Sequence, residues 1–167
     1  MKMSELKSKW KKIRDTNLGT AIYIVGGFFF AWLAMTGLGF ALSTDTPVVA
    51  VFSGSMVPTF YKGDMIIVSS PSSGVTGMFL GENKIQGYKV GDIIVFDAVK
   101  GGYKFPIIHR IVSENSDGTF ETKGDANSVQ GDFEHGVRES QIHGKAILKI
   151  PILGWVKVGA FELLGLA

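Results

Sequence analysis

The sequence GTAIYIVGGFFFAWLAMTGLGFAL, residues 19–42, decides the architecture of this chain. It lies within a run from Leu18 to Thr44 that has 27 residues and no charged side chain. A helix rises about 1.5 Å per residue, so roughly 20 apolar residues cross the hydrocarbon core of a membrane. A buried core helix is usually shorter, and the apolar region of a cleaved signal peptide spans only about 7–15 residues. We therefore expect residues 18–44 to form an uncleaved transmembrane helix.

Charge is distributed unevenly around this run. Residues 1–15 carry six basic and two acidic side chains, whereas the rest of the chain carries 11 basic and 13 acidic ones. A short basic flank stays in the cytoplasm under the positive-inside rule. We expect a basic cytoplasmic N-terminus at residues 1–17, a single pass through the cell membrane, and an extracytoplasmic domain, which is lumenal if the chain is eukaryotic. The net charge of +2 thus reports topology. Because no basic face interleaved with aromatic residues appears beyond the anchor, we expect no nucleic-acid partner.

The composition limits what the rest of the chain can be. The chain has 167 residues, of which 46% are hydrophobic and 19% charged, and its mean hydropathy is +0.23. This length suits one domain of ordinary size, and the apolar content excludes a disordered chain. The absence of cysteine excludes disulfide scaffolds, thiolate metal sites and cysteine nucleophiles.

Residues 45–150 read as a β-rich domain. Six short runs are rich in β-branched residues and bounded by turn residues. They are VVAVF at 48–52, MIIV at 65–68, DIIVF at 92–96, PIIHRIV at 106–112, GTFETK at 118–123 and KAILKI at 145–150. Without long helical patterns between them, these runs predict a mainly β fold with an antiparallel sheet or a barrel-like arrangement. The pairs Gly63-Asp64, Gly91-Asp92 and Asp117-Gly118 are expected in turns.

The C-terminal segment, residues 151–167, is apolar but too interrupted for a full second span. Lys157 and Glu162 break the run PILGWVKVGAFELLGLA. We expect a short helix that lies at the membrane interface, inserts partly, or packs on the domain. Trp155 suits the headgroup level of a bilayer.

The segment Ser53-Gly54-Ser55-Met56-Val57-Pro58-Thr59 begins nine residues beyond Thr44, so a serine there is held close to the membrane. Glycine between two serines permits a tight bend that exposes a hydroxyl, although such triplets also occur in ordinary turns. A serine nucleophile needs a base. His109, inside PIIHRIV, is the candidate base, and a lone strand histidine is also common as a structural residue. His135 and His143 lie in polar surroundings that are typical of the surface.

A histidine base in turn needs a carboxylate that orients its ring. The segment GDANSVQGD, residues 124–132, supplies Asp125 and Asp132 in a glycine-containing loop after a strand. A plain turn is one alternative for this pair, and two carboxylates in one loop could also hold a cation.

Together, these segments resemble the type I signal peptidases, in particular their archaeal and endoplasmic-reticulum branch. The resemblance runs from about residue 20 to about residue 155 and rests on a basic N-terminus with one anchor and on four motifs in order. The motifs are Ser53-Gly54-Ser55-Met56 with Pro58-Thr59, VGDIIVF at 90–96, IHRI at 108–111, and the segment 124–132. The resemblance implies a membrane-anchored serine endopeptidase that removes N-terminal signal peptides from exported preproteins. It implies cleavage after small residues, with no cofactor and no metal.

The resemblance also implies a role for each site residue. Ser55 would be the nucleophile, and His109, where bacterial members place a lysine, would be the general base. Asp132 would complete the catalytic triad, with Asp125 as a supporting carboxylate. The chain departs from the usual pattern, because Ala126 stands where a second asparagine is usual and the two aspartates lie seven residues apart instead of six. A larger role for Asp125 therefore stays open.

Substrate contacts follow from the same reading. The Ser55 backbone N–H and, by resemblance, the Ser53 hydroxyl would stabilise the oxyanion. An extended peptide would add to the strand edges that lead into Ser55 and His109. By resemblance, a shallow apolar pocket for small side chains is lined by Val51, Met56, Ile107 and Ile108.

The expected partners are the signal peptides of preproteins, the lipid bilayer and, as a further candidate, the translocation machinery. The alternative interpretation is a catalytically inactive, membrane-anchored homologue that holds peptides in the same groove. The complete set of Ser55, His109 and Asp132 argues against it. A self-cleaving repressor relative would need a soluble DNA-binding part and a lysine base, and the sequence shows neither.

Overall fold

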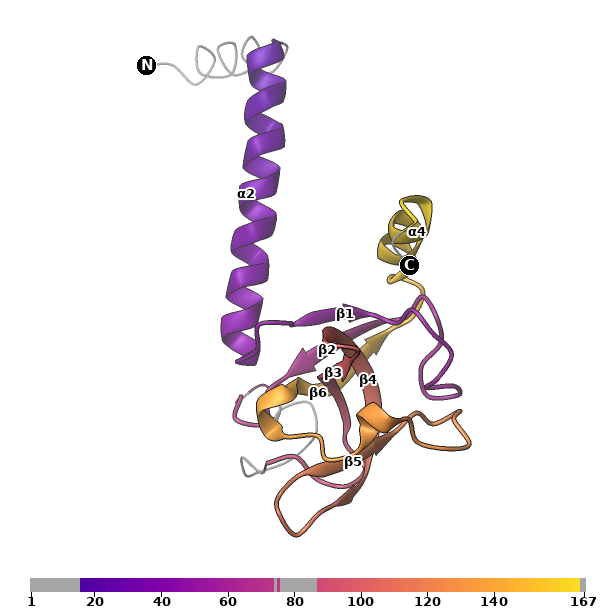
Figure 1. Cartoon of the computed structure of the whole chain (residues 1–167). Coiled ribbons are helices and arrows are strands. Elements are labelled where there is room, and N and C mark those ends of the chain that lie inside the picture. The colour runs from indigo at the N-terminus through magenta and orange to yellow at the C-terminus, as the bar shows by residue number, and fades with distance from the viewer. Residues whose placement is uncertain (1–15, 74, 76–86, 166–167) are drawn as a thin grey trace. The chain divides into compact units, whose positions relative to one another are not determined.

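The computed structural model describes residues 16–73, 75 and 87–165 (Figure 1). The basic segment predicted at residues 1–17 lies almost wholly outside the described residues. The chain forms two compact units, Met1–Leu38 and Gly39–Ala167, and each is described by itself.

In the first unit, the apolar run forms α2, a single helix whose full extent is Asn17–Leu42. Its 26 residues make it about 39 Å long, which exceeds the roughly 30 Å of a bilayer's hydrocarbon core. Only 6% of its most apolar window is buried within the structure, and Phe28 and Phe30 are 76% and 71% exposed. The helix therefore has the length, composition and exposure of a membrane-spanning segment, and it is not a buried core helix.

The last turn of α2 belongs to the second unit, where serines bind its terminal carbonyls. Those carbonyls have no partner inside the helix. The Leu42 carbonyl accepts hydrogen bonds from Ser69 Oγ at 3.1 Å and Ser70 N at 2.9 Å, and the Ala41 carbonyl accepts one from Ser73 Oγ at 2.9 Å. The point at which the chain leaves the helix is thus fixed to the β-rich unit.

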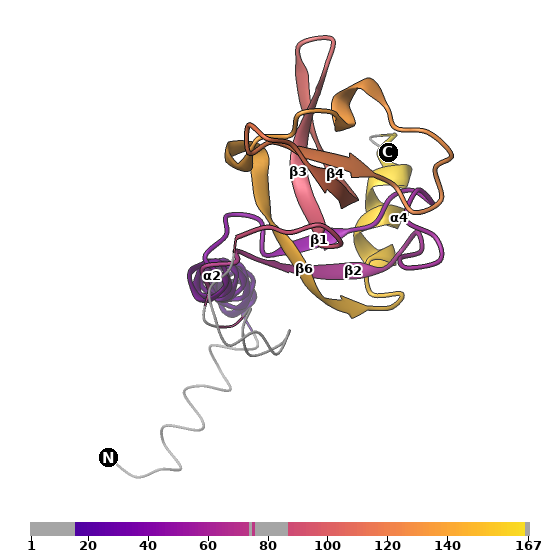
Figure 2. The same cartoon turned by 90° about the horizontal axis from the view of Figure 1, so that it is seen from below.

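Six antiparallel strands form one sheet in the order β1-β2-β6-β3-β4-β5 (Figures 1 and 2). They are β1 (Val48–Ala50), β2 (Met65–Ser69), β3 (Ile93–Lys100), β4 (Tyr103–Glu114), β5 (Phe120–Lys123) and β6 (Ile142–Ile150). Each of the six predicted runs overlaps one of these strands. The prediction of a mainly β, antiparallel fold is therefore confirmed. The sheet is not closed into a barrel, because β1 and β5 form two separate edges.

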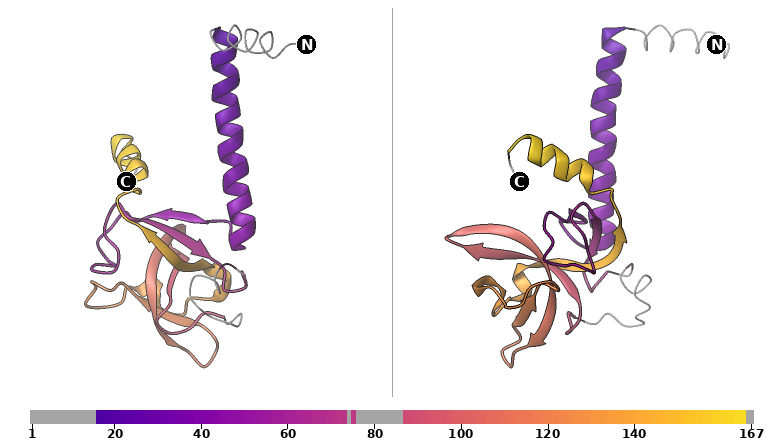
Figure 3. Two further views of the ribbon diagram at one scale, coloured as in Figure 1. Left: turned by 180° about the vertical axis from the view of Figure 1, so that it is seen from behind. Right: turned by 90° about the vertical axis from the view of Figure 1, so that its right-hand side faces the viewer.

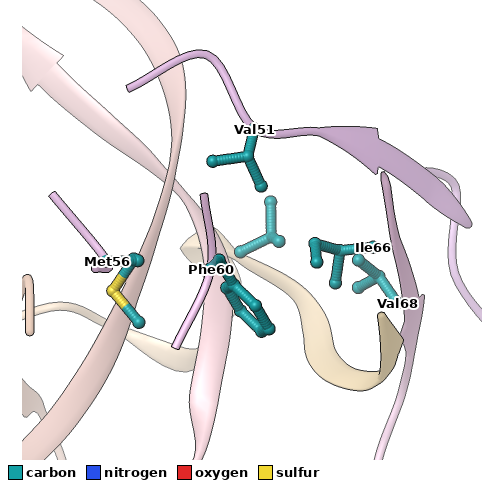
Figure 4. Packing of buried hydrophobic residues seen from close by; sticks show 6 residues of the cluster. Val51, Met56, Phe60, Ile66 and Val68 are labelled. Atoms are coloured by element: carbon teal, nitrogen blue, oxygen red, sulfur yellow. The ribbon is translucent and has the colours of Figure 1, made fainter. Parts of the chain in front are cut away.

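Strand β3 lies in the middle of the sheet, and its side chains alternate between two cores. Val95 joins a cluster on one face, made of Val51, Met56, Phe60, Ile66 and Val68 (Figure 4). Ile94, Phe96 and Ala98 point to the other face, where they pack with Ile111, Phe120 and Val137. Burial on both faces explains why β3 carries an unbroken apolar run instead of alternating with polar residues.

Strands β3 and β4 form the longest hairpin of the fold (Figure 3, right). Gly101 and Gly102 connect them with φ angles of 59° and 84°, a left-handed conformation that a tight hairpin turn favours. The register of this hairpin sets His109 opposite Ile94. Gly63, Gly91 and Gly118 also have positive φ angles, which confirms the turns predicted at their pairs with aspartate.

The C-terminal segment contains α4, Trp155–Leu163. Its start packs against the turn before β2, since a Cβ atom at Gly63 would lie 2.1 Å from Trp155 Nε1. Phe161 packs on Phe52 with ring centroids 5.6 Å apart. The predicted short helix is therefore confirmed, and it contacts the domain. Several apolar side chains around it are exposed: Ile152, Leu153, Val156, Leu163 and Leu164.

Candidate active site

The segment after β1 presents two serine hydroxyls on a bend whose ends are fixed in the core. Val51 N donates to Asp64 O and Val51 O accepts from Gly63 N, both at 2.9 Å. Met56 is fully buried, so the segment is fixed on its other side (Figure 4). Between these two points the hydroxyls of Ser53 and Ser55 lie 3.1 Å apart. The core thus determines where both oxygens lie.

His109 stands next to this bend. Its Nε2 atom lies 3.0 Å from Ser55 Oγ, although the two residues are 54 positions apart in the sequence. His109 is only 4% exposed, because the serine bend and the backbone at Gly124 both pack against its ring. The structure therefore brings together the predicted nucleophile and the predicted base at hydrogen-bond distance, as a serine–histidine pair requires.

The carboxylate on the other ring nitrogen belongs to Glu134, which sequence reasoning did not single out. Glu134 lies in η1, a one-turn 3-10 helix at Asp132–Glu134. Its Oε1 atom is 2.5 Å from His109 Nδ1, and its Oε2 atom accepts a hydrogen bond from Gly131 N at 2.6 Å. Glu134 is 1% exposed. The spacing of Gly131 and Glu134 is the signal that could have pointed to this residue, since a glutamate three residues after a cap position often binds the cap N–H.

Asp132 does not occupy the place expected for it. Within the described ranges, no hydrogen bond or ion pair joins Asp132 to His109, and the residue is exposed at the start of η1. The reason is geometric. A 3-10 helix turns about 120° per residue, so side chains two positions apart cannot point the same way. With Glu134 directed to His109, Asp132 is directed away from it.

Asp125 binds a different partner. Its carboxylate accepts hydrogen bonds from Arg110 Nε at 2.8 Å, from Arg110 Nη2 at 2.7 Å and from the Thr59 hydroxyl at 2.5 Å. Arg110 follows His109 in β4, and Thr59 follows the serine bend. Asp125 therefore connects the two segments that carry Ser55 and His109, which is compatible with the supporting role predicted for it. Within the described residues, no hydrogen bond joins Asp125 to the histidine ring.

A close backbone approach completes this arrangement. A Cβ atom at Gly124 would lie 2.7 Å from Ser55 O and 2.9 Å from His109 Nε2. Two residues further along the chain, the backbone amide of Ala126 donates to Ser55 O at 2.8 Å. The start of the 124–132 segment thus packs directly on the serine–histidine pair, and only glycine fits at position 124.

Burial and hydrogen bonding, respectively, lower the pKa values of His109 and Asp125. Burial lowers the pKa of His109, and the nearby Glu134 and Asp125 carboxylates only partly offset this effect. The imidazole is therefore neutral near pH 7 and free to accept a proton. Hydrogen bonds from Arg110 lower the pKa of Asp125, so that carboxylate stays ionised.

A cleft of about 390 Å³ opens beside the serine–histidine pair. It is lined mainly by β1 and the bend that follows it, by the stretch 106–109 of β4, and by Asn127, Phe133 and Lys157. Three of the four predicted lining residues are in place, namely Val51, Ile107 and Ile108. The fourth, Met56, is not among the lining residues, because its side chain points into the core cluster (Figure 4). Phe133, which was not predicted, narrows the cleft from the η1 side.

The other two histidines contact carboxylates away from this site. His135 Nδ1 is 2.5 Å from Glu121 on the surface. His143 lies between two aspartates, with Nδ1 2.9 Å from Asp45 and Nε2 3.0 Å from Asp97. Among the described residues, no group of three or more His, Asp or Glu side chains is arranged to hold a metal ion.

The chain is similar in sequence to known signal peptidases over most of its length. The family described as "Signal peptidase, peptidase S26" matches residues 22–148. The signal peptidase complex catalytic subunit SEC11 of Colletotrichum graminicola is 31% identical over 138 residues, covering 77% of this chain and 72% of that protein. The same subunit of Dictyostelium discoideum is 31% identical over 137 residues (77% and 68%), and that of Candida dubliniensis is 28% identical over 164 residues (87% and 88%).

A match of this extent, on a fold that sets a serine against a histidine beside an open cleft, identifies the family. The chain belongs to the type I signal peptidases, in the branch that includes SEC11, which are serine endopeptidases that remove signal peptides from preproteins.

Proposed function

We propose that Ser55 is the nucleophile of this signal peptidase and His109 its general base. The observation that carries the proposal is the 3.0 Å contact between Ser55 Oγ and His109 Nε2. Ser55 Oγ attacks the scissile carbonyl while His109 takes the hydroxyl proton, and His109 later gives that proton to the leaving amine. Because burial lowers the pKa of His109, the ring accepts this proton without first having to lose one.

The oxyanion forms next to the same bend. The Ser53 hydroxyl lies 3.1 Å from Ser55 Oγ, within reach of an oxygen on the carbon that Ser55 attacks. The Ser55 backbone N–H is the second donor. One such donor is worth roughly 10²–10³ in kcat. Ser53→Ala is therefore expected to retain weak activity, whereas Ser55→Ala retains none.

The substrate peptide lies extended in the cleft between two strand edges. β5 pairs only with Arg110–Glu114 of β4, so within the described residues the stretch 103–109 has no strand partner on that side. β1 pairs with β2 on one side and is otherwise an edge of the sheet. A peptide can therefore form backbone hydrogen bonds along either wall. Val51, Ile107 and Ile108 leave room for small side chains near the cleavage site, and Phe133 restricts larger ones.

The membrane is the setting of this reaction. α2 crosses the bilayer once, with the basic N-terminus in the cytoplasm and residues 45–150 outside it, or in the lumen in a eukaryote. α4 lies at the interface with its exposed apolar side chains in the lipid and Trp155 at the headgroups. SEC11 is named as the catalytic subunit of a complex, and we extend this to partner subunits for the present chain and to contact with the translocation machinery.

Cleavage of a preprotein by the detergent-solubilised full chain tests the proposal. Wild type, Ser55→Ala and His109→Ala are compared, with Ser113→Ala as a matched control at an exposed serine of β4. Mass spectrometry gives the cleavage position. Wild type and the control should cut after a small residue, and the two site variants should not. Equal cleavage by Ser55→Ala would overturn the proposal, and a wild-type chain that binds the preprotein without cutting it would support the inactive, peptide-holding homologue.

A further inference from the structure

We propose that Glu134, and neither aspartate of the 124–132 segment, is the positioning carboxylate that holds His109 for catalysis. This inference rests on the proposed roles of Ser55 and His109. It adds to them the third member of the triad, taken from outside the motif that carries the family resemblance.

The contacts of Glu134 are those of an orienting carboxylate. One oxygen accepts from His109 Nδ1 and the other from the Gly131 amide. A carboxylate only accepts hydrogen bonds, so it selects the histidine form with hydrogen on Nδ1. The lone pair on Nε2 then faces Ser55 Oγ, where the proton has to arrive. After transfer, the negative charge of Glu134 stabilises the imidazolium.

Burial makes this contact specific. The side chains of His109 and Glu134 are 5% and 1% exposed, so little water competes for either partner. A buried carboxylate is tolerated only when it is fully paired. Both oxygens of Glu134 are paired, one with His109 Nδ1 and the other with the Gly131 amide. Together, these two contacts fix the Glu134 side chain against the imidazole ring.

The main chain around Glu134 is held in place by β5. The Thr122 hydroxyl donates to Glu134 O at 3.4 Å, and Gln130 Nε2 donates to Thr122 O at 2.9 Å. Phe120 and Val137 form a further antiparallel bridge across the same loop. These contacts hold the loop on both sides of η1. A carboxylate on a loop therefore has the positional precision that catalysis needs.

The two aspartates are unsuited to the same task. Asp125 is occupied by the guanidinium of Arg110 and the hydroxyl of Thr59. Asp132 is exposed at the first position of η1. The three residues of η1 point in three directions: Asp132 toward solvent, Phe133 toward Phe105 at the edge of the cleft, and Glu134 to the histidine.

Glu134→Gln is the decisive variant, because it keeps the shape of the side chain and removes its charge. The amide oxygen can still accept from Gly131 N, and the amide nitrogen then donates to Nδ1. This places the histidine proton on Nε2, the nitrogen that must be unprotonated. By analogy with the equivalent change in a known serine protease triad, we expect kcat to fall by roughly 10²–10⁴, with KM little changed. Asp132→Asn is the competing variant, and Glu139→Gln, at an exposed glutamate of the 3-10 helix η2 (Glu139–Gln141), is the matched control.

Two further readouts separate positioning from a loss of structure. Nitrogen NMR of the imidazoles, with His109 identified by its substitution, should show the proton on Nδ1 in wild type and on Nε2 in Glu134→Gln. The acid limb of kcat/KM should move to lower pH in Glu134→Gln, because the Glu134 charge raises the pKa of His109 against the effect of burial. Glu134→Asp, which keeps the charge at a shorter reach, should recover part of the lost kcat.

The outcomes are distinct. Wild-type kcat in Glu134→Gln, or a larger loss in Asp132→Asn, would overturn the inference while leaving the serine–histidine proposal intact. If Glu134→Gln does not fold, the NMR spectrum of the wild-type protein still tests the inference. A His109 proton on Nε2 would overturn it, whereas a proton on Nδ1 together with partial activity of Glu134→Asp would support it. A failure of the proposed function would instead appear as full activity in Ser55→Ala.

Discussion

Gly124→Ala should disable the enzyme although position 124 carries no reactive group. The new Cβ atom would lie 2.7 Å from Ser55 O and 2.9 Å from His109 Nε2, whereas ordinary contacts begin near 3.4 Å. His109 would have to retreat by about 0.5 Å and the Ser55 carbonyl by about 0.7 Å. A misplacement of about 1 Å can cost roughly 10²-fold in rate, so we expect kcat to fall by about 10-fold to 100-fold.

Stability should respond less than activity. Overpacking costs about 1–3 kcal/mol, which lowers the midpoint of thermal unfolding by several degrees in a domain of this size. Preprotein cleavage at saturating substrate gives kcat, and a thermal melt of the same sample shows that the variant is folded. The expected pattern is a large fall in kcat with a modest fall in Tm.

Gly54→Ala is the matched control, and it lies inside the serine motif itself. A Cβ atom at Gly54 would meet only Val57 Cγ2, at 3.8 Å, and its φ angle is not positive. We expect this variant to fold and cleave like wild type. Full activity in Gly124→Ala, or a larger defect in Gly54→Ala, would refute the reasoning from close packing.

Three more predictions concern charge. Burial lowers the pKa of His109 more than nearby carboxylates raise it, so kcat/KM should fall toward acid with an apparent pKa below 6.5, and a pH–rate profile with a midpoint above 6.5 would contradict this. Asp125→Asn should destabilise the domain by about 1.5–2 kcal/mol, the lower part of the range for charged hydrogen bonds, because the Arg110 side chain is 32% exposed. An unchanged Tm in this variant would count against a stabilising contact between Asp125 and Arg110. Burial opposes the charged form of His143, but the hydrogen bonds that its ring donates to Asp97 and Asp45, together with the charges of these carboxylates, outweigh burial and raise the pKa of His143. The contribution of charged His143 to the stability of the fold is therefore fully present below about pH 6.5 and is lost as pH rises through the raised pKa of the folded state. The Tm of His143→Gln should accordingly differ from that of wild type most in mild acid. A Tm difference that grows with pH would contradict this role of His143.

The strands were predictable because each carries a local signal. The run DIIVF predicted a strand, and β3 forms there. The pair of Ser55 and His109 was predictable for another reason, since each lies in a short motif that carries the resemblance to signal peptidases. Their contact itself depends on how β4 crosses the bend after β1, a long-range property that no local pattern encodes.

The third carboxylate could not be predicted in this way. The motif directs attention to Asp125 and Asp132, but what reaches His109 depends on the path of the loop between β5 and η1. One turn of 3-10 helix decides which of Asp132, Phe133 and Glu134 points to the ring. Met56 was misplaced for a related reason: its neighbour Ser55 faces the cleft, and the next side chain on the bend points into the core.

The presence of Lys157 in the wall of the cleft has a practical consequence for protein engineering. α4 looks expendable, because it is short, apolar and C-terminal, and deleting it would be a natural step toward a soluble enzyme for crystallisation or screening. Such a truncated protein would retain Ser55, the proposed nucleophile, and yet present an incomplete groove to its peptides. Inhibitors selected against it would be fitted to a shape that the intact enzyme never offers.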